Sequence, residues 1–179
     1  DYLLLLDIAT ERPAEKNGKL YAAKDPRRNI ALNPFRNSSI NPRFNSSLNP
    51  RFNSAINPRF NSTINPRFNS SINPRFNSSI NLRFNSSINP RFNSRLNPRF
   101  NSSINPRNNW SFGGPYLYNK DLQQEGYLVR ANDEVELVFD VGGNLIGTLV
   151  NANDEVRVYF EDGDDWKGFV VQANEDVSL

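Results

Sequence analysis

Residues 64–71 read Ile-Asn-Pro-Arg-Phe-Asn-Ser-Ser, and this octapeptide recurs ten times with small changes between residues 32 and 109 of the 179-residue chain. A proline stands in nearly every octad, and proline removes a backbone donor and clashes with a continuing helix. Asn-Pro favours a turn, and the residues between two prolines leave room for one short strand. The repeat therefore predicts turns and short strands instead of a long helix.

Two positions of the octad are apolar in almost every copy, and we expect both to face a core. The first is always Ile or Leu, and the second is Phe in eight consecutive octads. A position that stays apolar at a fixed period indicates a buried face. The predicted core ladder consists of Ile40, Phe44, Leu48, Phe52, Ile56, Phe60, Ile64, Phe68, Ile72, Phe76, Ile80, Phe84, Ile88 and Phe92.

These patterns predict an all-β fold in which the octads build a β-solenoid. We prefer two octads per coil, with two short parallel sheets enclosing the Ile and Phe ladders and with stacked Asn side chains satisfying one another. A three-octad triangular coil and an extended polyproline-like rod are the alternatives. The arrangement resembles calcium-binding β-rolls and grass antifreeze solenoids only in its short half-coils, because the Gly-rich, Asp-bearing calcium motif is missing.

A second repeat, of 21 residues, follows the octads. The pattern of Val129–Val135 returns at Val150–Val156 and at Val171–Val177, and residues 142–144 and 162–164 have the composition of hairpin turns. Alternating apolar residues between such turns predict a small antiparallel sheet or an SH3-like domain. The predicted regions are an N-terminal strand and charged loop (1–29), the octad solenoid (30–109), an aromatic, Gly-containing linker (110–126) and an acidic antiparallel β domain (127–179).

The N-terminal segment is apolar and is predicted to add as a strand to an edge of the C-terminal sheet. The third 21-residue unit stops after one strand, which leaves an edge to cover. The sheet could belong to the same chain or to a neighbour, and exchange between neighbours would give a head-to-tail filament. The predicted assembly strand comprises Tyr2, Leu3, Leu4, Leu5, Leu6 and Ile8. This run is too short to span a bilayer, so no membrane span is predicted.

The composition argues against catalysis and against a cofactor. Cys, His and Met are absent, which removes disulfides, thiol nucleophiles and the commonest ligands of transition metals. Asp162, Asp164 and Asp165 could bind calcium, but a solvated turn is the preferred interpretation. We therefore predict no catalytic, cofactor-binding or metal-binding residue, and no enzyme.

Charge is divided unevenly along the chain. Residues 30–109 carry eleven Arg and no acid, whereas residues 110–179 carry four basic and fourteen acidic residues. The two regions can attract each other within one molecule or between neighbours. The Arg residues of the array could also bind a polyanion, and these candidates are Arg43, Arg51, Arg59, Arg67, Arg75, Arg83, Arg91 and Arg99.

The repeat also creates sequons for N-glycosylation. Eight Asn residues begin Asn-X-Ser/Thr, although the repeat itself accounts for that number. They are Asn37, Asn45, Asn61, Asn69, Asn77, Asn85, Asn101 and Asn109. An extracellular or cell-surface location is the corresponding expectation.

Three functions are compatible with the sequence. The preferred one is a structural repeat protein that assembles with itself head to tail into fibres or acts in adhesion. The first alternative is a module that binds an acidic polymer, either polysaccharide or nucleic acid, through the Arg array. The second is an ice-binding solenoid with a flat outward array of small polar groups.

Overall fold

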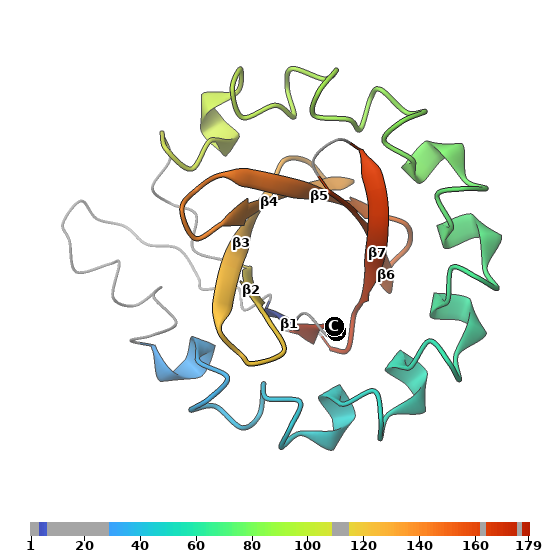
Figure 1. The fold of residues 1–179 in the computed structure, drawn as a ribbon, viewed down its shortest axis with the longest axis vertical. Helices are drawn as coiled ribbons and strands as arrows, with labels where there is room; N and C mark the ends of the chain where they lie inside the picture. The colour runs from blue at the N-terminus through green and yellow to red at the C-terminus, as the bar shows by residue number, and fades with distance from the viewer. Residues whose placement is uncertain (1–3, 7–28, 109–114, 162–163, 175–176) are drawn as a thin grey trace.

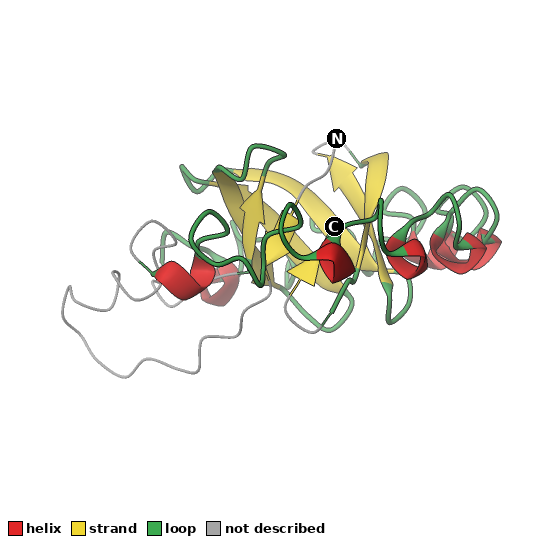
Figure 2. Ribbon diagram, turned by 90° about the horizontal axis from the view of Figure 1, so that it is seen from below, coloured by secondary structure: helices red, strands yellow, loops and turns green. Residues whose placement is uncertain are grey.

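The computed structural model describes residues 4–6, 29–108, 115–161, 164–174 and 177–179. Two layers are visible in Figure 1, because the octads, residues 29–108, form an open ring around a curled β-sheet. Seen from its edge, the ring lies on both sides of the sheet at about one level (Figure 2). No helix in the described residues is long and apolar enough to cross a membrane.

Each octad forms two successive turns, and each turn begins at an Asn. In one octad, the Asn69 side chain accepts a hydrogen bond from the Ser71 amide at 3.1 Å and caps a 3-10 turn. Asn73 then opens a second turn, in which its backbone carbonyl accepts from Phe76 and its side chain accepts from the Arg75 amide. Asn-Pro suits this turn, because Asn favours the first position and proline fixes φ at the second.

The 3-10 helices span Ile30–Leu32 (η1), Ser46–Leu48 (η2), Ser54–Ile56 (η3), Ser62–Ile64 (η4), Ser70–Ile72 (η5), Ser78–Ile80 (η6) and Ser102–Ile104 (η7). Residues 29–108 contain no strand. The predicted solenoid, with strands in every coil, is therefore wrong. In the ring, Asn side chains make the hydrogen bonds to backbone groups that strand pairing would make in a solenoid. An octad is too short to form both a pair of strands and two turns.

Asn side chains also tie each octad to the one before it. The Asn73 side-chain amide donates to the Pro66 carbonyl at 2.8 Å, and that of Asn69 donates to the Thr63 carbonyl at 2.7 Å. These bonds recur along the array. The expected Asn-to-Asn ladders are replaced by side chain to backbone bonds, in which most of the Asn side chains act as both acceptor and donor.

The sheet is antiparallel and has eight strands in the order β7-β6-β5-β4-β3-β2-β1-β8. The strands are Leu4–Leu6 (β1), Tyr116–Tyr118 (β2), Gln124–Arg130 (β3), Val135–Asp140 (β4), Leu145–Asn151 (β5), Val156–Glu161 (β6), Asp165–Val171 (β7) and Val177–Ser178 (β8). The sheet curls until its ends meet, because Val171 and Leu179 exchange backbone hydrogen bonds. The all-β class and the antiparallel tail agree with the prediction.

Two sequence segments join the sheet from outside the predicted β domain. β2 and the first residues of β3 fall in the region that we expected to be a linker. β1 pairs with β2 on one side and with β8 on the other, within the same chain. The predicted N-terminal strand thus covers the edge left by β8. Tyr2, Leu3 and Ile8 lie outside the described residues.

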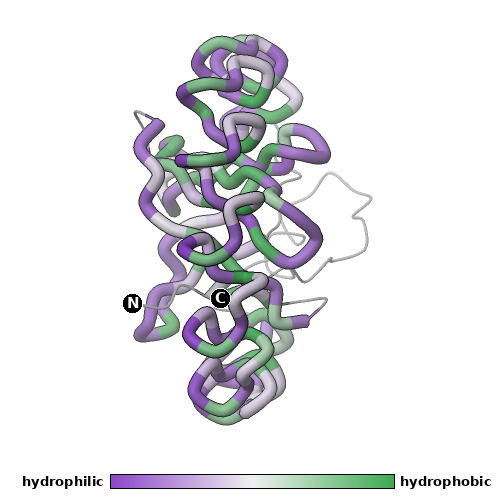
Figure 3. Tube along the Cα trace, turned by 90° about the vertical axis from the view of Figure 1, so that its right-hand side faces the viewer, coloured by the Kyte–Doolittle hydropathy of each residue, from purple (hydrophilic) through white to green (hydrophobic). Residues whose placement is uncertain are grey.

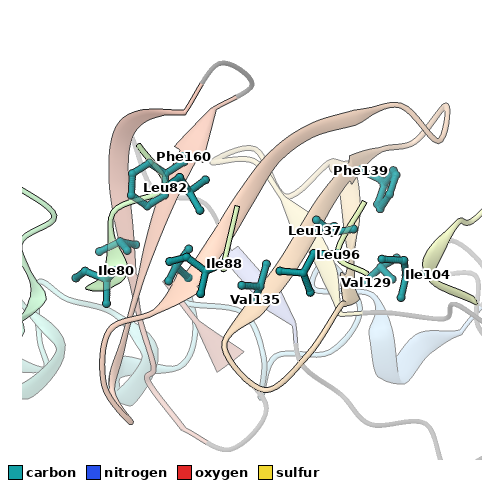
Figure 4. Packing of buried hydrophobic residues seen from close by; sticks show 12 residues of the cluster. Ile80, Leu82, Ile88, Leu96, Ile104, Val129, Val135, Leu137, Phe139 and Phe160 are labelled. Atoms are coloured by element: carbon teal, nitrogen blue, oxygen red, sulfur yellow. The ribbon is translucent and has the colours of Figure 1, made fainter. Parts of the chain in front are cut away.

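The ring and the sheet share their hydrophobic core. Ile80, Leu82, Ile88, Leu96 and Ile104 pack against sheet residues that include Val129, Leu137 and Phe160 (Figure 4). Leu32, Ile40 and Leu48 pack against Tyr116, Tyr118 and Val177, and Ile56, Ile64 and Ile72 pack against Val156 and Val171. At least one aliphatic side chain from each octad therefore covers the outer face of the sheet.

The Phe half of the predicted core ladder is wrong. Phe44, Phe52, Phe60, Phe68, Phe76, Phe84, Phe92 and Phe100 are 71–76% exposed, whereas the Ile and Leu positions are buried. Ile and Phe are four residues apart and belong to different turns of the octad. Because the two turns reverse the chain between them, only the aliphatic residue reaches the sheet.

Candidate polyanion-binding belt

Exposed arginines and phenylalanines recur in pairs along the ring. In most octads the aliphatic residue is buried, the next Asn and Pro are buried or half-buried, and the Arg and Phe after them are exposed. Figure 3 shows hydrophilic and hydrophobic positions alternating along the turns of the ring. We call this surface the Arg–Phe belt; it consists of Arg43, Phe44, Arg51, Phe52, Arg59, Phe60, Arg67, Phe68, Arg75, Phe76, Arg83, Phe84, Arg91, Phe92, Arg99 and Phe100.

The second turn of each octad fixes the direction of the belt residues. The side-chain oxygen of Asn65 accepts from the Arg67 amide at 2.9 Å, and the Asn65 carbonyl accepts from the Phe68 amide at 3.0 Å. The same bonds occur in neighbouring octads, so the backbone turn that carries each Arg and Phe is repeated along the ring. The belt is a regular array of cations and aromatic rings on a fixed backbone.

Part of the belt is neutralised by the sheet. Arg83 pairs with Asp165, and Arg91 lies 3.7 Å from Asp164. Asp164 also accepts a hydrogen bond from the Asn89 side chain at 3.0 Å. Asp164 and Asp165 thus contact the ring, and the opposite charges of the two regions meet within one molecule. Asp162 lies outside the described residues.

Two further arginines touch the sheet region without an acid. The Arg75 guanidinium lies 5.9 Å from the centre of the Trp166 ring, which is a cation–π distance. The Arg43 side chain donates to the Lys120 carbonyl at 3.1 Å. These contacts orient the two side chains and leave their charges in place.

The remaining arginines are available to a ligand. Within the described part of the chain, the side chains of Arg51, Arg59, Arg67 and Arg99 make no ion pair or hydrogen bond. Adjacent like charges repel each other in water, and a bound anion relieves that repulsion. The segment from Arg51 to Phe68 is therefore the part of the belt with the most unpaired charge.

A hollow beside the ring adds a second cationic feature. It has a volume of about 550 Å³ and lies between the ring and the β4–β5 turn. Arg91, Arg99 and Arg107 line it, together with Asn144 of that turn. Three arginines from consecutive octads thus face one recess at the inner border of the belt.

The glycosylation candidates are part of the hydrogen-bond network. In each of the seven described sequons, the Asn side-chain nitrogen donates to the backbone of the preceding octad, as Asn45 does to the Ser39 carbonyl at 2.7 Å. The same donation is made by Asn37, Asn61, Asn69, Asn77, Asn85 and Asn101. Asn109 lies outside the described residues. A glycan would attach to a nitrogen that already holds two octads together.

Two titratable groups of the sheet, Tyr127 and Asp140, have shifted pKa values that burial and hydrogen bonds within the sheet explain. Burial raises the pKa of Tyr127, and the nearby negative charge of Asp140 adds to this effect. A hydrogen bond from the Asn144 side chain lowers the pKa of Asp140, and the Asn144 amide lowers it further. Among the described residues, no group of three or more acids is placed to hold a metal ion.

Comparison with protein-family models, curated proteins and solved structures finds no match to this chain. The exposed Arg and Phe residues of the belt are therefore the main indication of function. The sequence identified the Arg residues of the belt, but it assigned the Phe residues to a core. The signal that could have corrected this assignment is the Pro-Arg pair before each Phe, because a turn at that point separates Phe from Ile.

Proposed function

We propose that the chain binds single-stranded nucleic acid along the Arg–Phe belt. The observation that carries this proposal is the exposure of eight Phe rings, at 71–76%, each beside an Arg. Proteins that bind single strands without sequence preference combine a basic track for the phosphates with aromatic rings on which bases stack. Both components are present here at the same period.

Charge and exposure support the same ligand. The octad region carries eleven Arg and no acid, and four of the belt arginines have unpaired side chains among the described residues. Large exposed apolar patches are uncommon on monomeric proteins and mark interaction sites. A flexible polyanion with planar bases uses the cations and the rings together, whereas an acidic polysaccharide uses mainly the cations.

Binding can be measured by fluorescence anisotropy with a labelled oligothymidine over a range of salt concentrations. We expect affinity to fall steeply with salt, with a slope of about −0.7 per phosphate neutralised. Replacing Arg51, Arg59 and Arg67 by Gln should reduce the magnitude of that slope by about 2. Replacing Phe52, Phe60 and Phe68 by Ser should cost about 1–3 kcal/mol for each stacked base that is lost.

The matched control replaces Ser54, Ser62 and Ser70 by Ala, because these serines are exposed on the same octads. That variant should bind like the parent chain. If oligothymidine affinity depends on the arginines but not on the phenylalanines, bases do not stack on the belt and the proposal of nucleic acid binding is wrong. The proposal fails if the parent chain does not bind oligothymidine at low salt.

Self-assembly is the second candidate function. Opposite charges on the belt and on the sheet already attract each other at Arg83 and Asp165, and the same attraction between copies would be a head-to-tail contact that does not close. Exposed Phe rings would add apolar area to such a contact. An extracellular or cell-surface fibre or adhesive layer is the corresponding role.

Sedimentation velocity tests assembly directly. The assembly proposal predicts species larger than a monomer at micromolar concentration, and loss of these species in the variant with Phe52, Phe60 and Phe68 replaced by Ser. A parent chain that stays monomeric at low and high salt excludes this proposal. Ice binding is less favoured, because it needs a flat face and the octads curve around the sheet (Figure 1).

A further inference from the structure

The inner face of the curled sheet has an apolar cluster and a cavity of its own. Leu117, Leu128, Val138, Leu149 and Val170 form a buried cluster there, separate from the clusters that contact the ring. A cavity of about 520 Å³ lies against these residues and extends past β7 to Pro50 and Ile56 of the ring. Small-molecule sites commonly have volumes of about 300–1,000 Å³ and mainly apolar walls.

The 21-residue repeat places three glycines along this inner face. Gly126, Gly147 and Gly168 pair across the sheet with Leu117, Val138 and Tyr159, respectively. A Cβ atom on Gly126 would overlap the Phe139 carbonyl, and one on Gly147 would overlap the Tyr159 ring. These two glycines are therefore required by close neighbours.

Gly168 is different, because it faces open space. A Cβ atom there would meet no described atom within 4 Å, and its φ angle is compatible with other residues. The Tyr159 ring fills the space over Gly147. The volume that an aromatic ring occupies beside Gly147 is therefore open beside Gly168.

The rim of the cavity is built from the same position of all three repeats. A register shift next to each glycine leaves one extra residue, and these bulge residues are Glu125, Ile146 and Lys167. All three line the cavity. Bulges redirect side chains and are frequent beside functional sites. Lys167 also pairs with Glu161 at 3.1 Å.

These features define the chemistry of an occupant. The walls are mainly aliphatic, with Phe169 and Tyr159 as the aromatic residues. The pKa of Tyr159 is raised by burial and by the charge of Glu161. The rim holds one acid, Glu125, and one base, Lys167, whose charge is paired with Glu161, so it does not favour a carboxylate or a sulfonate. From this geometry we propose that the inner face of the sheet binds a compact, uncharged molecule that has an apolar body and one polar group directed at the rim.

The test uses prodan, an uncharged naphthalene ketone whose emission moves to shorter wavelength in apolar surroundings. We expect saturable binding to the full chain with one site per molecule, and weaker binding of the anionic probe anilinonaphthalene sulfonate. Gly168→Leu places a side chain in the open space and should reduce prodan affinity by about tenfold or more.

Two controls separate this site from the Arg–Phe belt. The variant with Phe52, Phe60 and Phe68 replaced by Ser should bind prodan like the parent chain, and Gly168→Leu should bind oligothymidine like the parent chain. Prodan affinity that is lost in the Phe variant and retained in Gly168→Leu would overturn the cavity proposal. The result for prodan binding does not affect the test of oligothymidine binding, because the two tests use different variants and different probes.

A second measurement applies if Gly168→Leu does not give the circular dichroism of the parent chain. Intermolecular nuclear Overhauser effects can be recorded between prodan and the methyl groups of the unmodified chain. Contacts to Leu117, Leu128, Leu149 or Val170 are expected. Absence of binding by the parent chain, or contacts only to Phe rings, would overturn the proposal.

Discussion

The ring and the sheet are stabilised in different ways. The sheet has backbone ladders between strands and apolar side chains on both faces, so it forms a core with its own inner cluster. The ring has one buried aliphatic residue per octad, and its backbone is held by Asn side chains. The difference indicates that the ring covers the outer face of the sheet through its aliphatic residues.

The largest effect is expected when the ring is separated from the sheet. We expect a chain that ends at residue 108 to remain unfolded, because one Ile per octad cannot bury enough apolar surface without the sheet. Circular dichroism and the dispersion of amide resonances would show the loss of structure. A cooperative thermal transition in the shortened chain would show that the ring folds by itself.

The next effect concerns a single contact between ring and sheet. Ile72 is fully buried against Val156 and Val171. Replacing it by Ala removes apolar contacts and leaves a cavity, so Ile72→Ala should reduce the free energy of unfolding by about 2–5 kcal/mol. Ser71→Ala, an exposed change in the same 3-10 turn, is the control. Denaturant titration gives both values, and equal stability of the two variants would contradict the shared core.

A smaller loss is expected at the Asn side chains that hold the ring. Asn73 is 6% exposed and makes hydrogen bonds to the Arg75 amide and the Pro66 carbonyl. Asn73→Ala leaves both groups without this partner, which should cost about 1–3 kcal/mol. The same change in the sheet turn, Asn144→Ala, should cost less because that side chain is exposed. Denaturant titration gives the free energy of unfolding of both variants. A smaller loss in Asn73→Ala than in Asn144→Ala would show that the Asn73 side chain does not hold the ring.

Much of the sheet could be predicted from local patterns. The alternation in β4 and β6 and the glycines of residues 142–144 define hairpins without reference to distant residues. The N-terminal strand could be predicted because an unpaired sheet edge needs a partner. That partner can come from any part of the chain, however far away in the sequence. Gly126 was missed, although it extends the 21-residue period backwards by one unit and marks β3 as a member of the repeat.

The ring could be predicted only in part. Its turns follow from Asn-Pro, and the burial of the Ile positions follows from their constancy. The exposure of Phe could not be deduced from constancy, because copies of one octapeptide retain every residue regardless of burial. The packing of the octads on the sheet depends on contacts between residues such as Ile72 and Val156, which are 84 positions apart, and no local period encodes that distance.

A pH effect is expected at the β4–β5 turn, within the sheet. Hydrogen bonds from Asn144 lower the pKa of Asp140 below its ordinary value of 3.8. A carboxylate with a lowered pKa in the folded state stabilises the fold above its unfolded-state pKa, and this contribution is lost as pH falls through the folded-state value. Asp140→Asn should therefore lower the thermal midpoint near neutral pH and reduce the loss on acidification below about pH 4. Asp154→Asn is the control, and identical pH profiles for the parent chain and Asp140→Asn would exclude the effect.

The smallest expected change is at the belt itself, where Phe68 is 73% exposed and lies one turn before the buried Ile72. Phe68→Ser removes little buried surface, so the free energy of unfolding should change by no more than about 0.5 kcal/mol. Denaturant titration beside Ile72→Ala compares the two faces of the ring in adjacent turns. If Phe68→Ser were as damaging as Ile72→Ala, the outer face would contribute to folding, and the division between a stabilising inner face and a binding outer face would be wrong. If stability is unchanged while oligothymidine affinity falls, the belt contributes to binding and not to the fold.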